Sequence, residues 1–417
     1  MKIISMQFLA TLTALTVSIL PASISTAAEH KIEPLTLARV IELSSADAPE
    51  VRLASSRIAE GEAKLAGAQV RSLENPSLDL SAGPRTGSET TIDLELGAEI
   101  PIELGNRRDK RSAVARAGLE QARHATEDAR RLSVAAAVGA YYRVLQAEER
   151  LGLAGERKAV ADQVLRIAQD RHAAGDAARF EVNLGRTEMA RAESEIAAAR
   201  GRLATARASF ARTLGLPSAA GLQIAGNLRE RNFFDAIQSA QGSPKRADLS
   251  AAQAEVEASQ AAISLAEAER LPDLALRLSY KREGDENVAL GGVSFTLPFL
   301  NPRQAQVQEA RVQHQRAQLA AQLSQAAISA EIEGARKAYA AAVEAVGRLE
   351  SDGVALQQEN ETLAQESYRA GKINLSTLLQ LRKDALETRQ EYLDRLLEAA
   401  EAGVELASAC GKWTTTN

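Results

Sequence analysis

Residues 90–108 read TTIDLELGAEIPIELGNRR, and this stretch joins two different periodicities. Apolar and polar residues alternate strictly over 91–100, which predicts a β-strand with one apolar and one polar side. Pro101 interrupts this pattern, and a charged, alanine-rich run without proline begins at Asn106. Such a run predicts a long helix. The stretch therefore predicts a half-apolar strand that leads directly into a very long helix.

The same combination occurs a second time about 196 residues later. NPSLDLS at 75–81 resembles LPDLALRLS at 271–279, and IPIELGNR at 100–107 resembles LPFLNPR at 297–303. RHAAGD at 171–176 resembles SYRAGK at 367–372, and Leu214-Gly215 corresponds to Cys410-Gly411. Four landmarks at one offset predict a tandem structural duplication.

The duplication sets the predicted organisation of the chain. Each repeat should contain a helix, two strands, and a helical hairpin formed by a long helix, a short break and a return helix. The predicted segments are a signal peptide (1–28), a first repeat (29–214, with strands 77–86 and 90–100 and hairpin 106–214), a connector (215–247), a second repeat (248–411, with strands 273–282 and 287–297 and hairpin 302–409) and a C-terminal tail (412–417). Pro49 should interrupt the opening helix of the first repeat.

The N-terminus has the three parts of a secretory signal peptide. Lys2 is followed by an apolar segment over 3–20 and by small residues at 25–28, although an uncleaved anchor is an alternative. No later segment has 18 uninterrupted apolar residues, so no transmembrane helix is expected. The single cysteine, Cys410, cannot form a disulfide within one chain, and we expect it to be a small buried residue.

The composition and motifs argue against catalysis and against binding of nucleic acid. The chain has 50 basic and 55 acidic residues and a net charge of −5, which suggests no polyanionic partner. The histidines stand far apart, without a paired metal-ligand spacing, and no nucleophile or phosphate-binding motif occurs. We therefore predict no enzymatic activity, no cofactor and no metal site. The four histidines are His30, His124, His172 and His314.

The strands have the length that crosses an outer membrane when tilted, about 9–11 residues. The alternative is a set of ordinary amphipathic strands over a soluble core. Four strands alone leave two open edges, which lipid does not tolerate, so closure by oligomerisation is required. Two copies are the minimum, because eight strands can close a small barrel, and three copies give twelve strands. Gly291-Gly292 should mark a bulge. The polar face should line a lumen, with Asp79, Asp93, Glu95, Glu99, Arg277, Lys281 and Arg282.

The helices over 106–173 and 302–369 lack internal proline, and 68 residues of helix extend about 100 Å. In the second repeat a 4,3 spacing of seam residues predicts a left-handed coiled coil. Gly175 and Gly371 follow the ends of these helices, where glycine caps are common, and should form the tips of the two hairpins. The seam residues are Ile328, Ile332, Ala335, Tyr339, Ala342, Val346, Leu349, Gly353, Leu356, Asn360 and Leu363.

These segments together resemble the TolC-like outer-membrane efflux proteins of Gram-negative bacteria. The resemblance rests on the opening 34–69, NPSLDLS, IPIELGNRR, the tip YRAGKINLSTLLQ at 368–380, and the duplication. It implies an α+β membrane protein, a homotrimer with a twelve-stranded outer-membrane barrel continuous with a helical periplasmic tunnel. It also implies a periplasmic adaptor and an inner-membrane pump, of the RND type, as partners. PIELGNRR is most similar to the subgroup that serves cobalt–zinc–cadmium pumps.

The resemblance also implies positions for functional residues. The adaptor-contacting tips would be Gly175, Asp176, Arg369, Ala370, Gly371 and Lys372. The best-known family members have aspartates six and nine residues after the second tip glycine, which narrow the tunnel entrance, whereas this chain has Thr377 and Gln380 there. Glu181, six residues after the first tip glycine, would supply charge at the entrance instead. The chain should thus be a passive exit duct, and a periplasmic adaptor or structural coiled-coil protein is the alternative.

Overall fold

The computed structural model describes residues 34–86, 91–230, 232–239 and 246–413. The predicted signal peptide lies outside the described residues, as do the turn at 87–90, part of the connector and the end of the tail. Within the described ranges, no helix is both long and apolar enough to cross a membrane. The described residues, from Pro34 onward, belong to one compact unit.

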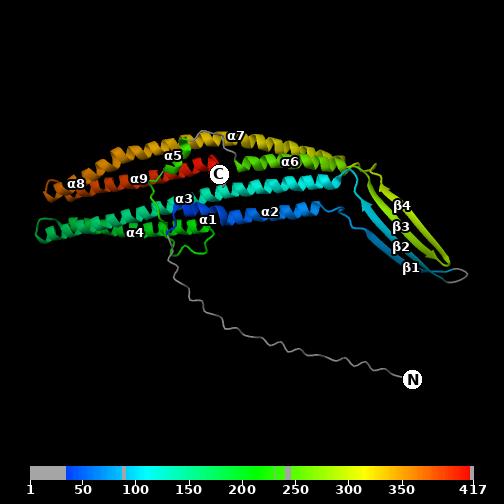
Figure 1. Cartoon of the computed structure of the whole chain (residues 1–417). Helices are drawn as coiled ribbons and strands as arrows, with labels where there is room; N and C mark the ends of the chain where they lie inside the picture. Colours follow the sequence, from blue (N-terminus) through cyan, green and yellow to red (C-terminus); the bar gives the residue numbers. More distant parts are fainter. Residues whose placement is uncertain (1–33, 87–90, 231, 240–245, 414–417) are drawn as a thin grey trace, which may run out of the picture. The chain divides into compact units, whose positions relative to one another are not determined.

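Each repeat contributes helices around a pair of strands (Figure 1). Two hairpin helices are very long, and α3 alone has 67 residues, about 100 Å of helix. The elements of the first repeat are α1 (Leu37–Ala46), α2 (Pro49–Ala68), β1 (Ser77–Arg85), β2 (Thr91–Ile102), α3 (Arg107–Ala173) and α4 (Arg179–Thr213). They are followed by α5 (Asn232–Ser239), α6 (Ala247–Ala268), β3 (Asp273–Glu283), β4 (Glu286–Thr296), α7 (Gln304–Arg348), the π-helix η1 (Leu349–Val354), α8 (Ala355–Arg369) and α9 (Leu375–Ala409).

The strands form one antiparallel sheet in the order β1-β2-β3-β4. The pairing of β3 with β4 runs without interruption from Asp273↔Thr296 to Glu283↔Glu286, so the bulge predicted at Gly291-Gly292 is wrong. What changes at the two glycines is the face that carries apolar residues. Val293 lies on the face of Leu276, whereas Leu290 lies opposite Ser279 on the polar face.

Left-handed backbone marks both junctions between strand and helix. Asn106 and Arg303 have φ of 54° and 52° and directly precede α3 and α7. Gly105 has φ of 71°, and a Cβ atom there would lie 2.4 Å from Leu271 Cδ1, so both conformation and space require glycine. These equivalent turns, together with positive φ at Gly215 and Gly411, confirm the predicted duplication.

Two arginines at the start of α3 stabilise the junction between β2 and α3. Arg107 donates hydrogen bonds to the carbonyl oxygens of Ala268 and Leu271, at 3.2 and 2.6 Å, and pairs with Asp273. Arg111 pairs with Glu103 and donates to the carbonyl oxygens of Ala68 and Val70. Because the last carbonyl groups of a helix lack intrahelical partners, these contacts stabilise the ends of α6 and α2 where strands begin.

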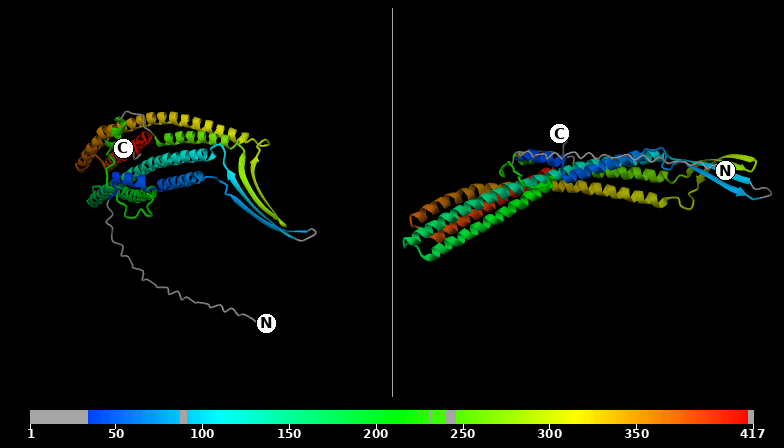
Figure 2. Two further views of the ribbon diagram at one scale, coloured as in Figure 1. Left: turned by 45° about the vertical axis from the view of Figure 1, so that its right-hand side comes forward. Right: turned by 90° about the horizontal axis from the view of Figure 1, so that it is seen from below.

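The helices near the sheet repeat the order of the strands. Contacts join α2 to α3, α3 to α6 and α6 to α7, so the sequence α2-α3-α6-α7 parallels β1-β2-β3-β4 (Figure 2). Farther along, α3 packs against α4 and α9, and α9 packs against α7 and α8. One side of the subunit therefore ends in β1 and α2, and the other side ends in β4 and α7.

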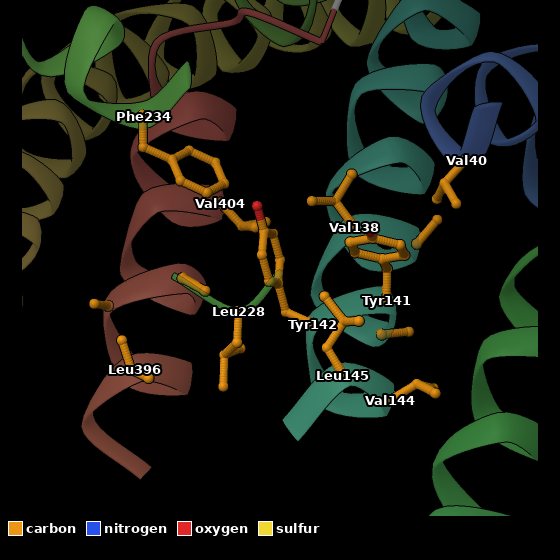
Figure 3. Packing of buried hydrophobic residues seen from close by; sticks show 14 of the residues in the cluster. Val40, Val138, Tyr141, Tyr142, Val144, Leu145, Leu228, Phe234, Leu396 and Val404 are labelled. Atoms are coloured by element: carbon orange, nitrogen blue, oxygen red, sulfur yellow. The ribbon is translucent and has the colours of Figure 1, made fainter. Parts of the chain in front are cut away.

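The largest buried cluster lies where the two hairpins meet (Figure 3). Phe234 of α5 packs between Tyr142 and Tyr339, with ring centroids 5.9 and 6.2 Å away, and these tyrosines are 197 residues apart. Tyr141 donates to the carbonyl oxygen of Ala225 at 2.7 Å, and burial raises the pKa of Tyr141 to about 12. Cys410 is buried in the same cluster, which confirms that prediction.

One helix and one residue outside the predicted repeats contribute to this core. Helix α5 lies in the predicted connector, but the offset of 196 aligns it with residues 36–43, and hence with α1 of the first repeat. Trp413, in the predicted tail, is buried and stacks on Phe233 with centroids 5.1 Å apart. The connector thus supplies the aromatic centre of the fold.

The π-helix η1 changes the predicted coiled-coil seam. Before it, Ile328, Ala335, Tyr339 and Val346 are buried as the 4,3 spacing predicts. A π-helix accommodates an additional residue in a turn and rotates the helix beyond it. Consequently Leu356 and Leu363 are exposed, and Ala364 and Tyr368 take the buried positions. The predicted seam holds through Gly353, which packs against Thr388 of α9, and is wrong from Leu356 onward, because hydrophobic spacing alone does not show the change in helical phase.

Packing against Phe234 gives a test of this core. A Cβ atom at Gly403 of α9 would lie 2.5–2.9 Å from three Phe234 ring atoms. We expect Gly403→Ala to lower the free energy of unfolding by about 1–3 kcal/mol, since overpacking forces the ring to move. Denaturant unfolding in detergent, followed by Trp413 fluorescence, measures this change.

Gly201 of α4 is the matched control, because a Cβ atom there meets nothing within 4 Å. Gly201→Ala should raise stability by up to about 1 kcal/mol through helix propensity. Equal effects of the two variants would contradict the close packing of Gly403 against Phe234.

Candidate functional site

The sheet has one charged face, and its charges are paired across strands. Glu95 lies directly opposite Lys281 and Glu99 directly opposite Arg277, with ion pairs of 3.1 and 2.9 Å. Arg85 joins Asp93 to Glu283 at 2.9 and 3.0 Å. Cross-strand pairs of opposite charge stabilise a sheet. Glu95 and Glu99 are thereby compensated, but Arg85 alone serves both Asp93 and Glu283, so carboxylates outnumber cations on the described part of this face.

The register of the strand pairs shows on which face of the sheet the other predicted lumen residues lie. Asp79 is opposite Gly97 and shares the polar face with Glu95 and Glu99. The sequence predicts Arg282 on this face as well, but Arg282 pairs with Leu94 and lies on the other face. Adjacent residues of a strand point to opposite faces, so Lys281 and Arg282 cannot share one. That the polar face lines a lumen stays a prediction.

The opposite face of the sheet is apolar and exposed. Ile92, Leu94, Leu96, Ala98, Ile100 and Ile102 follow β2 on this face, and Leu78, Leu80, Leu276, Leu278 and Tyr280 flank them. The large residues among these are exposed by more than a third of their surface. An apolar face of this size on a single chain marks a contact with another apolar phase or protein.

The two hairpins end in equivalent capped turns. Gly175 and Gly371 have φ of 82° and 71°. After the first helix, the amide groups of Gly175 and Asp176 donate to His172 and Arg171, and after the second those of Gly371 and Lys372 donate to Tyr368 and Ser367. This double hydrogen bond is the Schellman motif. It leaves Gly175, Asp176, Ala370, Gly371 and Lys372 exposed, whereas Arg369 is the last residue of α8.

Behind their tips the two hairpins share a buried apolar cluster and a polar contact. The cluster contains Val164, Ala168, Val182, Ala364, Tyr368, Leu375 and Leu378. Arg171 of α3 donates to the hydroxyl oxygen of Tyr368 at 3.3 Å, and its guanidinium lies 5.8 Å from the centre of that ring. The hydrogen bond to Tyr368 raises the pKa of Arg171. Glu181 lies 3.9 Å from Arg171 and is mostly covered. Of the three residues predicted at the tunnel entrance, Glu181 is thus held within the first hairpin, beside the arginine that contacts Tyr368.

The other two predicted entrance residues have local roles. Asn374 caps α9 by accepting from the amide of Thr377 at 2.8 Å, and the Thr377 hydroxyl donates to the same oxygen. Gln380 donates to Asp384 at 2.8 Å and is exposed. The carboxylate nearest to Gln380 along α9 is therefore Asp384, and the positions of the family's aspartates do not predict it.

Sequence reasoning missed two features at this end. Phe180, five residues after Gly175, is 67% exposed, and a large exposed aromatic in a chain with only 3% aromatics is a usable signal. The Arg171–Tyr368 contact was also missed, because nothing in the sequence shows which side chains of separate hairpins meet. Among the described residues, no group of three His, Cys, Asp or Glu side chains is arranged to hold a metal ion.

A four-stranded sheet that is apolar on one face and charged on the other, joined to long helical hairpins, defines a subunit of an outer-membrane channel. A protein-family model described as "Outer membrane efflux protein" matches residues 40–216 and 239–412. The chain belongs to this family.

Curated relatives and solved structures agree with this assignment. The chain is 25% identical to the cobalt-zinc-cadmium resistance protein CzcC of Cupriavidus metallidurans over 91% of its length and 90% of the relative's. It is 26% identical to protein CyaE of Bordetella pertussis, over 92% and 85% of the two chains. The crystal structure of the CmeC outer membrane channel of Campylobacter jejuni matches with a TM-score of 0.74 and 16% identity, over 91% and 87%.

These findings confirm the predicted family and fold class, that of the trimeric TolC-like channels with four strands per chain. The protein is an outer-membrane exit duct of tripartite efflux systems that extends into the periplasm, and not an enzyme. Members of the family work as trimers with adaptor proteins and inner-membrane pumps. The alternative of an adaptor or a structural coiled coil is set aside.

The cross-strand ion pairs of Arg277 and Lys281 lead to a test of the ion selectivity of the barrel. Replacing the two cationic partners, Arg277→Gln with Lys281→Gln, would leave Glu95 and Glu99 unpaired on the polar face. We expect the conductance to become more cation selective, because fixed negative charge raises the local cation concentration. The reversal potential under a KCl gradient in planar bilayers measures this.

Arg282→Gln is the matched control, since it removes one positive charge from the opposite face. It should leave the reversal potential unchanged. A shift as large as that of the double variant would contradict the assignment of the polar face to the lumen.

Proposed function

We propose that three copies of this chain close into one duct. The side of one subunit that ends in β4 and α7 would contact the side of the next subunit that ends in β1 and α2. The observation that carries this proposal is the shared order of β1-β2-β3-β4 and α2-α3-α6-α7. Strand β4 and strand β1 run in opposite directions, so β4 of one subunit can pair with β1 of the next in the same antiparallel way. The helices that follow β4 and precede β1 then meet as well.

Exposed apolar side chains on the outer helices support this closure. Leu53 of α2 is exposed, and so are Val312, Leu319 and Leu323 of α7. The three α7 residues are spaced by seven and four positions and therefore share one face of the helix. A stripe of this kind along an unpaired helix favours contact with a neighbouring helix. The continuous wall would combine twelve strands with the helices below them.

The hairpin tips are the surface that we assign to the periplasmic adaptor. They carry opposite charges, Asp176 on one turn and Lys372 on the other, and Phe180 is exposed beside them. The Arg171–Tyr368 contact holds the two hairpins together just behind this surface. Gly175, Ala370, Gly371 and the backbone of Arg369 complete the two turns. An adaptor that binds here would link the duct to an inner-membrane pump of the RND type.

Heavy-metal cations are the substrates that we propose for this duct. The support is the similarity to the cobalt-zinc-cadmium resistance protein over nine-tenths of both chains. Ion pairs with Arg277 and Lys281 compensate Glu99 and Glu95, which fits a duct that conducts cations without retaining them at these two carboxylates. Selection would then rest with the pump, and the energy for transport would come from it.

Trimer formation tests the closure. Leu319→Glu with Leu323→Glu would place two carboxylates in the proposed contact between neighbouring subunits, where desolvation of charge is unfavourable. We expect a lower proportion of heat-labile trimers on unheated gels and in size-exclusion chromatography. Gln318→Glu with Gln325→Glu adds the same charge on a different side of α7, because these exposed residues are seven positions apart and point away from the stripe, and should assemble normally. Normal trimers from both double variants would exclude this face as the contact.

A resistance assay tests the substrate and the tips together. In cells that have a heavy-metal pump and adaptor but lack their own exit duct, the wild-type chain should restore growth in zinc, cobalt or cadmium. Gly371→Val should fail to do so while trimers remain in the membrane, because a β-branched residue at φ of 71° costs about 1–2 kcal/mol and distorts the turn.

Gly371→Asn is the control, because asparagine adopts the left-handed conformation more readily. It should retain most of the resistance. Full resistance with Gly371→Val would contradict the role of the tips. Failure of the wild-type chain with a metal pump, together with success beside a drug pump, would contradict the substrate.

A further inference from the structure

The turn that joins β4 to α7 exposes three large apolar side chains. Phe299 and Leu300 are 76% and 87% exposed, the highest values among the large hydrophobic residues that the structure describes, and Leu297 is 60% exposed. The membrane duct proposed above does not by itself account for these side chains, because they lie beyond the last residue of β4, Thr296.

The equivalent turn of the first repeat has a different character. The offset of 197 aligns Phe299 with Ile102 and Leu300 with Glu103. Glu103 is covered, pairs with Arg111 at 3.0 Å and accepts from the amide of Leu73 at 3.1 Å. Leu300, at the same place in the second repeat, has an apolar side chain that can form no such pair. The difference between two duplicated turns shows that the apolar side chains are not a requirement of the strand-to-helix geometry.

The apolar face of β4 is shorter than that of β2. On β2 it extends from Ile92 to Ile102, about 33 Å along the strand at about 3.3 Å per residue. On β4 it extends only from Ala289 to Phe295, about 20 Å, and includes Gly291. At a tilt of about 40° these lengths correspond to about 25 and about 15 Å across the membrane, against an apolar band of about 25 Å.

Leu297 continues the apolar face of Val293 and Phe295 by strand alternation, and Phe299 and Leu300 follow after Pro298. Arg303, three residues later, lies 3.8–3.9 Å from Asp273 and Glu269 and connects the end of the turn to the charged side of the junction. Aromatic and leucine side chains at the edge of an apolar band are typical of residues that insert into the membrane interface.

We propose that Leu297, Phe299 and Leu300 form an anchor that inserts into the inner leaflet of the outer membrane and supplies the apolar length that β4 lacks. The occupant of this surface is thus lipid and not a second copy of the chain. The inference rests on the proposed assignment of the apolar sheet face to lipid. It adds a lipid contact made by a turn, on one repeat only.

Spin labelling of the assembled trimer tests this anchor. Single cysteines at Phe299→Cys or Leu300→Cys are introduced into a Cys410→Ala background, which removes the only other thiol, and the labelled trimers are placed in phosphatidylethanolamine–phosphatidylglycerol vesicles. Collisions of the label with oxygen, which concentrates in hydrocarbon, are compared with collisions with a water-soluble nickel complex. We expect an oxygen-to-nickel ratio several-fold above that of an aqueous site.

Leu278→Cys and Ser279→Cys are the controls, since these adjacent residues lie on the apolar and polar faces of β3. They should report lipid and water, respectively. If Leu278→Cys reports water, the lipid-facing assignment of the sheet fails. If the controls behave as expected and the turn labels collide mainly with nickel, or with neither reagent because a neighbouring subunit covers them, the anchor is refuted and the duct stands.

Discussion

The sheet of four strands ends in two strands, β1 and β4, each of which pairs on one side only within the described part of the chain. In lipid an unpaired amide or carbonyl group costs several kcal/mol, because no water is present to replace the missing hydrogen bond. A chain with this sheet can therefore occupy a membrane only if its edges are paired by further copies. The requirement extends to the helices, because α2 and α7 lie below the same two edges.

The duplication provides a simple way to meet this requirement. Two repeats give a subunit with equivalent landmarks, from the left-handed turns at Asn106 and Arg303 to the tips at Gly175 and Gly371. Their equivalence is not complete, and the differences are informative. Among the described helices, a π-helix occurs only in the second hairpin, and the exposed turn at Phe299 replaces one that contains the paired Glu103. Such departures identify positions at which the two repeats have different surroundings.

The structure assigns stability and transport to different parts of the subunit. The region where the hairpins meet contains the buried tyrosines and Phe234, and it fixes the two repeats to each other. The sheet and the two turns at the hairpin tips have few buried side chains and display their charges or glycines to the surface. A duct needs such a division, since its ends must contact lipid and partner proteins while its middle maintains the arrangement of long helices.

Much of this protein was determined by its sequence alone. Strict alternation over Thr91–Ile100, the absence of proline from the long helices and the repeated landmarks predict the elements, the duplication and the family, because each is a local pattern with a direct steric cause. Pairings between separate elements were beyond such patterns. Only the tertiary structure showed that Phe234 fills the space between Tyr142 and Tyr339, and that Arg171 meets Tyr368.

Two predictions, the bulge in β4 and the later part of the coiled-coil seam, are wrong for the same reason. The phase change at Gly291-Gly292 resembled a bulge, but pairing with β3 keeps the register unbroken. The predicted seam beyond Gly353 followed a regular period, but one π-helical turn rotated Leu356 and Leu363 to the surface. A sequence specifies which residues are apolar and how they are spaced. The partner strand and the exact helical phase decide which face those residues occupy, and both depend on contacts with distant parts of the chain.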